Sequence, residues 1–170
     1  DNVTITGSTA ARGGGIYVYN LDGGLNISNS TISNNTAINY SNFGGNGGGI
    51  SVRDTDTVIT GTTMDSNTIN GSGGNGQSGG GIYSYSNNLT IDKTTISNST
   101  ASHSGGGIYD RGGSTVVLTN STIHGNTTNA SNGGGINFSG GTSTITNTTI
   151  FNNTAYYHGG GAALWGTNYL

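Results

Sequence analysis

The sequence predicts an all-β fold: a right-handed parallel β-helix of about six coils, with three short strands in each coil. Two observations predict it. A triple glycine recurs six times along the chain, and apolar residues recur between the triplets at nearly fixed offsets. Successive triplets begin 26 to 34 residues apart, a spacing typical of solenoid repeats. The triplets begin at Gly13, Gly47, Gly79, Gly105, Gly133 and Gly159.

Three columns of apolar residues emerge when the repeats are aligned. The first directly follows the triple glycines and contains Ile16, Ile50, Ile82, Ile108, Ile136 and Ala162. The second contains Ile5, Ile32, Met64, Ile96, Ile123 and Ile150. The third lies five residues before the second and contains Ile27, Ile59, Ile91, Leu118 and Ile145. Apolar and polar residues alternate around each column, as they do in a strand with one buried face.

Such short strands are not stable alone, but stacking solves the problem because each strand can pair with its copy about 4.8 Å along the axis. A right-handed coil is expected from the general chirality of parallel connections. An Asn-Thr or Ser-Thr pair after the second column marks a turn, and the variable stretch from there to the next triple glycine is expected to be a loop.

Residues 1–170 form a single β-helix domain by this interpretation. Because both ends fall inside a repeat, we expect a segment of a longer or filament-forming β-helix.

The composition excludes several classes of function. The chain has 34 glycines, no cysteine, 6% charged residues and a net charge of −3. Four basic residues are too few to neutralise a nucleic-acid backbone, and no apolar run reaches the roughly 20 residues of a membrane-spanning helix. Without cysteine there is no disulfide and no thiolate metal site. His103, His124 and His158 are dispersed over the repeat, so we expect neither a metal nor a cofactor.

Two alternating motifs resemble those of a known family. Ile-Ser-Asn-Asn (32–35), Ile-His-Gly-Asn (123–126) and Ile-Phe-Asn-Asn (150–153) alternate with Gly-Gly-Gly-Ile. Over the whole chain, this pattern resembles the Phe-x-x-Asn and Gly-Gly-Ala-Ile repeats of chlamydial-type polymorphic outer-membrane proteins. Here Ile or Met stands for the Phe, and a third Gly stands for the Ala. The resemblance implies the passenger part of a secreted or surface-anchored adhesin, and therefore an extracellular or cell-surface location.

Aromatic and basic residues follow the first column on what should be the outer face. Three positions after the isoleucine come tyrosine and arginine in alternation, which at coil spacing permits cation–π contacts of about 0.5–1 kcal/mol each. Such a stripe either binds sugars, a host-cell surface or a lateral partner, or only braces the sheet. The candidate binding residues are Tyr17, Tyr19, Arg53, Tyr83, Tyr85, Tyr109, Arg111 and Trp165.

No cluster of residues predicts catalysis. The seven acidic residues are all Asp, and the densest group, Arg53, Asp54 and Asp56, is expected to be a solvated turn. Asp110 and Arg111 lie two coils further on. Asp110 shares an inward column with Val18, Val52, Phe138 and Leu164, where a carboxylate is costly.

We therefore expect a structural or adhesive β-helix, not an enzyme. Its expected partners are further copies stacked head-to-tail or neighbouring β-helix segments, together with glycans or a host-cell surface. Abundant Asn-x-Ser/Thr triplets permit N-glycosylation in a glycosylating host. The alternative is a polysaccharide-binding or polysaccharide-degrading module, a lyase or a hydrolase, that uses a face formed by Arg53, Asp54, Asp110 and Arg111.

Overall fold

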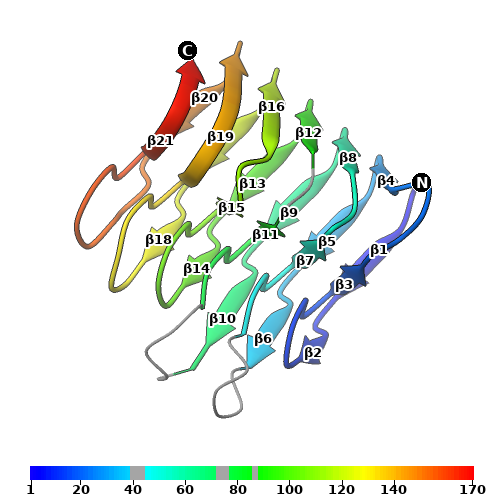
Figure 1. The fold of residues 1–170 in the computed structure, drawn as a ribbon. Coiled ribbons are helices and arrows are strands. Elements are labelled where there is room, and N and C mark those ends of the chain that lie inside the picture. Colours follow the sequence, from blue (N-terminus) through cyan, green and yellow to red (C-terminus); the bar gives the residue numbers. More distant parts are fainter. Residues whose placement is uncertain (39–44, 72–76, 86–87) are drawn as a thin grey trace.

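A computed structural model of the chain describes residues 1–38, 45–71, 77–85 and 88–170. The described residues wind into a right-handed parallel β-helix, with the two termini at opposite ends of the stack (Figure 1). Every pair of neighbouring strands is parallel, so each coil repeats the path of the coil before it. Among the described residues, no helix has the length and hydropathy that a membrane crossing needs.

The strands form three sheets. The first sheet contains β1 (Thr4–Thr6), β5 (Thr31–Ser33), β9 (Thr63–Asp65), β13 (Thr95–Ser97), β17 (Thr122–His124) and β20 (Thr149–Phe151). The second contains β2 (Thr9–Ala10), β6 (Thr36–Ile38), β10 (Thr68–Asn70), β14 (Thr100–Ala101) and β18 (Thr127–Thr128).

The third sheet has two limbs that merge in its last two strands. One limb contains β3 (Ile16–Tyr19), β7 (Ile50–Arg53), β11 (Ile82–Tyr85) and β15 (Ile108–Arg111). The other contains β4 (Leu25–Ser28), β8 (Thr57–Thr60), β12 (Leu89–Asp92) and β16 (Thr115–Thr119). The long strands β19 (Ile136–Thr146) and β21 (Ala162–Tyr169) continue both limbs.

The predicted columns are confirmed residue by residue. Ile50 and Ile82 are register partners, as are Met64 and Ile96 in the second column and Ile59 and Ile91 in the third. These central residues are fully buried and belong to one continuous aliphatic core. Burying such side chains stabilises the fold by about 1.5–3 kcal/mol each, which offsets the shortness of the strands.

The expectation of three strands per coil is wrong, because the stretch after the Asn-Thr turn is a fourth strand. This stretch was expected to be a loop, but it forms the second sheet. There Ala37, Ile69 and Ala101 are buried as a small separate cluster. In β6, β10, β14 and β18, a single inward residue per strand, which is Thr128 in β18, is buried at this corner. The longest variable stretches of the loop, residues 39–44 and 72–76, lie outside the described residues.

Asparagine and glycine make the two tight corners possible. At one corner, Asn35 donates from Nδ2 to Asn67 Oδ1 at 3.1 Å, and Asn67 donates to the Ile32 carbonyl at 2.8 Å. Ser99 interrupts this ladder, which resumes with Asn126, whose Nδ2 donates to the Oδ1 of the half-buried Asn153 at 3.0 Å. At the triple-glycine corner, a Cβ on Gly48 would lie 2.4 Å from the Gly80 carbonyl oxygen, so only glycine fits between adjacent coils.

Candidate functional site

Tyrosine and arginine alternate at the ends of four adjacent strands. Tyr19 pairs in register with Arg53, Arg53 with Tyr85, and Tyr85 with Arg111. We call these four residues the Tyr–Arg column. The Arg53 Cζ atom lies 5.8 Å from the centroid of the Tyr19 ring and 5.0 Å from that of Tyr85, within the range of cation–π attraction. Arg53 is therefore held between two aromatic rings, in the arrangement that the sequence predicted.

The column offers an exposed aromatic ring at its Tyr19 end and an exposed guanidinium at its Arg111 end. Tyr19 is 59% exposed, Arg111 is exposed, and Arg53 and Tyr85 are half-buried. Further along the same register lie Ser139 and Trp165, and Trp165 is 46% exposed. Exposed aromatic rings such as those of Tyr19 and Trp165 offer flat surfaces that a sugar ring or a flat protein partner can stack on.

The other predicted contact residues, Tyr17, Tyr83 and Tyr109, are only partly exposed to solvent. Tyr17 is 44% exposed and Tyr109 is half-buried, but Tyr83 is only 5% exposed, so its inclusion among exposed contact residues is wrong. The Tyr83 ring packs 5.8 Å from that of Tyr109, and burial raises the pKa of the Tyr83 hydroxyl. Strand alternation predicts that a side chain points outward, but not whether other residues cover it. Tyr83 therefore braces the sheet.

The turns that follow β3 and β7 line an open acidic hollow beside the column. The hollow has a volume of about 610 Å³, and its backbone is shaped by Asp54, which has a left-handed φ of 50°. The backbone N–H of Leu21 donates to Thr55 Oγ1 at 2.9 Å, and the backbone N–H of Asn88 donates to Asp56 Oδ1 at 3.0 Å. The hollow is lined by Leu21, Asp22, Gly23, Gly24, Asp54, Thr55 and Asp56. The sequence predicted that Asp54 and Asp56 lie in a solvated turn. It did not predict the hollow, because the wall opposite this turn is contributed by the preceding coil.

Asp110 does not contribute to an outer face. Its side chain is 0% exposed, and its strand partners on either side, Ser84 and Phe138, are also buried. Burial raises the pKa of the Asp110 carboxyl to about 6, although hydrogen bonds from Ser84 and Ser114 act to lower it. The alternative site that combined Arg53, Asp54, Asp110 and Arg111 is therefore wrong. Asp110 points into the core, while its neighbour Arg111 points out.

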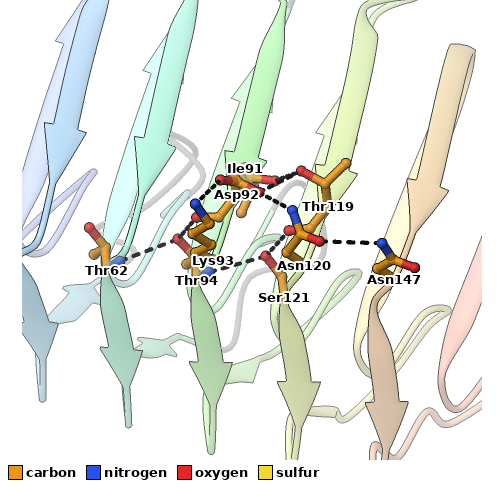
Figure 2. A network of polar contacts seen from close by, with 9 residues as sticks. All are labelled: Thr62, Ile91, Asp92, Lys93, Thr94, Thr119, Asn120, Ser121 and Asn147. Atoms are coloured by element: carbon orange, nitrogen blue, oxygen red, sulfur yellow. Dashed lines mark hydrogen bonds and ion pairs between the residues drawn. The ribbon is translucent and has the colours of Figure 1, made fainter.

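Other aspartates have structural partners. In Figure 2, Asp92 Oδ1 accepts hydrogen bonds from Asn120 Nδ2 at 2.6 Å and from Thr119 Oγ1 at 2.9 Å, and these bonds lower the pKa of Asp92. Lys93 Nζ lies 3.9 Å from the other carboxylate oxygen of Asp92. Asn147 extends the network by donating to Asn120 at 3.4 Å. Asp92 thus connects its own coil to the left-handed asparagine corner of the next.

Asp65 repeats this arrangement on another corner. It accepts hydrogen bonds from Ser97 at 2.6 Å and from Asn98 at 2.7 Å. Burial acts to raise the pKa of Asp65, but these bonds, with one from Ser66, outweigh that effect and lower it. The carboxylates of Asp65 and Asp92 are therefore occupied in joining coils.

The histidines also lie apart and have local contacts. His124 stacks on Phe151 with ring centroids 4.9 Å apart, and His158 Nδ1 lies 2.8 Å from Asn132 Oδ1. His103 Nδ1 lies 3.0 Å from Ser104 Oγ. Within the described ranges, no group of three or more histidine or acidic side chains is placed to hold a metal ion.

The comparisons with known proteins agree with this geometry. The family described as the right-handed beta helix region matches residues 15–164, which is most of the chain. The comparison with curated proteins and the comparison with solved structures gave no match. Stacked parallel strands, buried isoleucine columns and the family match all point to the same conclusion. The chain belongs to the family of right-handed β-helix regions.

Proposed function

We propose that the protein is a structural or adhesive β-helix of the cell surface or extracellular space, and that the Tyr–Arg column is its contact surface. The observation that carries the proposal is Arg53, whose guanidinium is held between the rings of Tyr19 and Tyr85 on the outer face. This stacking pre-orders three long side chains, so a partner that binds there pays less conformational entropy.

The family and the repeat motifs support this proposal at different levels. Right-handed β-helices occur in surface proteins and in proteins that act on polysaccharides. The resemblance of the Ile-x-x-Asn and Gly-Gly-Gly-Ile motifs to polymorphic outer-membrane proteins favours the first group. A rod with stacked aromatic residues along one side is also suited to extended partners such as glycan chains or another elongated protein.

A glycan array together with binding to host-type cells tests the contact surface. Tyr19→Ala and Arg53→Ala should each weaken binding about fivefold or more, the usual effect of truncating a central aromatic or arginine contact. Phe151→Ala is the matched control, because Phe151 is 43% exposed but lies on β20 in another sheet. Equal binding by the wild type and both column variants would refute the proposal.

The proposal includes self-association. At each end of the stack, strands have a neighbour on one side only, and their free backbone groups can pair with a further parallel coil from the same chain or from another copy. At the β1 end, Val3, Ile5, Ile16, Ile27 and Ile32 line a small apolar hollow of about 130 Å³ that such a coil would cover. Negative-stain microscopy of the purified chain should then show filaments of uniform width, and monomers at high concentration would argue against assembly.

The acidic hollow favours a second candidate, binding or cleavage of a polysaccharide. Three carboxylates, from Asp22, Asp54 and Asp56, line a hollow that directly adjoins the Tyr–Arg column. Carboxylates are the usual catalytic groups of glycoside hydrolysis. A lyase and hydrolase screen on acidic and neutral polysaccharides distinguishes the candidates. Turnover that is lost in Asp54→Asn and retained in Phe151→Ala would favour the enzyme over the adhesin.

A further inference from the structure

A carboxyl group lies inside the apolar core of the middle coils. Asp110 occupies an inward position on β15, between Ser84 on β11 and Phe138 on β19. We call the set of residues in this register the mixed column. Phe138, the partner of Asp110 in the next coil, and Val52, two coils away in the same register, are both fully buried in this core. The mixed column contains Val18, Val52, Ser84, Asp110, Phe138 and Leu164.

The hydrogen bonds of Asp110 are insufficient for an ionised carboxylate. Ser84 Oγ donates to Asp110 Oδ1 at 2.6 Å and Ser114 also hydrogen-bonds the carboxyl group, whereas Oδ2 has no hydrogen-bond partner within the described part of the chain. A buried charged oxygen without a donor costs more than a buried neutral one, because water solvates it in the unfolded chain and nothing replaces that water in the fold. The interior is therefore better matched to the neutral acid.

Among the described residues, no positively charged side chain faces Asp110 from the strands packed against it. The strands packed against it contribute the titratable side chains Tyr83 and Tyr85 from β11, and strand alternation directs both of them outward. On β15 itself, Tyr109 and Arg111 flank Asp110 and are likewise on the outer face. The neighbouring positions of β19 hold Asn137, Phe138 and Ser139, none of which carries a charge.

We propose that Asp110 is a pH-sensitive element built into the core, which stabilises the middle coils when it is protonated and loosens them when it is ionised. Tyr109 and Arg111, on the outer face of the same strand, are then best ordered in mildly acidic surroundings. The inference concerns the fold alone and is independent of what the Tyr–Arg column binds.

The direction of the effect follows from proton linkage. The pKa of Asp110 is about 6 in the fold, against 3.8 for an ordinary aspartate. The contribution of Asp110 to stability is therefore most favourable at low pH, falls as the pH rises from about 3.8 through about 6, and stays level above that. These two values correspond to a folding equilibrium constant about 25-fold smaller at pH 7.5 than at pH 4.5.

Urea unfolding of the whole chain between pH 4.5 and pH 7.5 tests the proposal, with Asp110→Asn as the neutral, nearly isosteric variant. The ratio of the wild-type folding constant to that of Asp110→Asn should fall about 25-fold across this range. Every other ionisable side chain is the same in both chains, so this ratio isolates Asp110. Asp92→Asn is the control. Because the pKa of Asp92 is lowered, this variant should change the free energy of unfolding by a similar amount at every pH in this range. The dependence of that free energy on pH should stay as in the wild type.

A constant ratio of wild type to Asp110→Asn across the pH range would overturn the proposal. If that variant does not fold, Asp110→Val replaces it, because valine already occupies this register at Val52. Hydrogen exchange of the wild type provides a measurement without any variant. The free energy of opening at the β15 amides should decrease between pH 4.5 and pH 7.5. An unchanged opening free energy at β15 would contradict the inference.

Discussion

Two interior columns run through the same strands two residues apart, and they differ in how much variation they accept. In the first column, which we call the isoleucine column, Ile50, Ile82, Ile108 and Ile136 are identical and fully buried. In the mixed column, the same strands place valine, serine, aspartate and phenylalanine. The isoleucine column lies against the triple-glycine corner, where each coil must repeat the previous one closely. The mixed column is further from that corner, and its side chains can differ in size and polarity.

The largest expected effect comes from breaking the isoleucine column. Ile108→Ala removes a fully buried side chain and leaves a cavity between two neighbouring isoleucines that cannot collapse without shifting their coils. The free energy of unfolding should decrease by about 2–5 kcal/mol. Urea denaturation followed by circular dichroism measures it. A loss below 1 kcal/mol would mean that the column is less continuous than the register indicates.

A smaller effect of opposite sign is expected in the mixed column. At pH 7.5, Asp110→Val removes a buried carboxylate and supplies the residue that Val52 places at the same register position. The free energy of unfolding should increase by about 2–3 kcal/mol, the equivalent of the raised pKa of Asp110. At pH 4.5 the gain should shrink, because the carboxyl is then largely neutral in the fold. Destabilisation at both pH values would show that packing, and not charge, decides this position.

The smallest effect concerns the serine beneath the carboxyl. Ser84→Ala removes the donor 2.6 Å from Asp110 Oδ1, which should lower the free energy of unfolding by about 1–2 kcal/mol at pH 7.5. The pKa of Asp110 should rise further, since this hydrogen bond lowers it in the wild type. Comparing urea midpoints at pH 7.5 and pH 4.5 measures the difference. An equal loss at both pH values would assign the effect to packing alone.

The sequence predicted the three apolar columns and the Tyr–Arg alternation because both depend only on position within a strict repeat. It failed for the fourth strand, since Thr36–Ile38 and its copies contain a single inward residue, too little for an alternation to be recognised. The burial of Tyr83 also depends on what covers the outer face, which strand periodicity does not describe. The acidic hollow is formed by turns from two coils, and only the stacked structure brings Asp22 and Asp56 together.

The register shared by β3, β7, β11 and β15 has a consequence for how such a molecule changes length. Because Ile50 and Ile82 occupy equivalent places, removing Ile50–Gly81 would join Gly49 to Ile82 and bring Ile16 opposite Ile82 with every ladder still aligned. Whole coils can therefore be gained or lost by duplication and deletion, and each coil changes the length of the rod by about 4.8 Å. The length of the rod along its axis can therefore change without altering the residues displayed along its side.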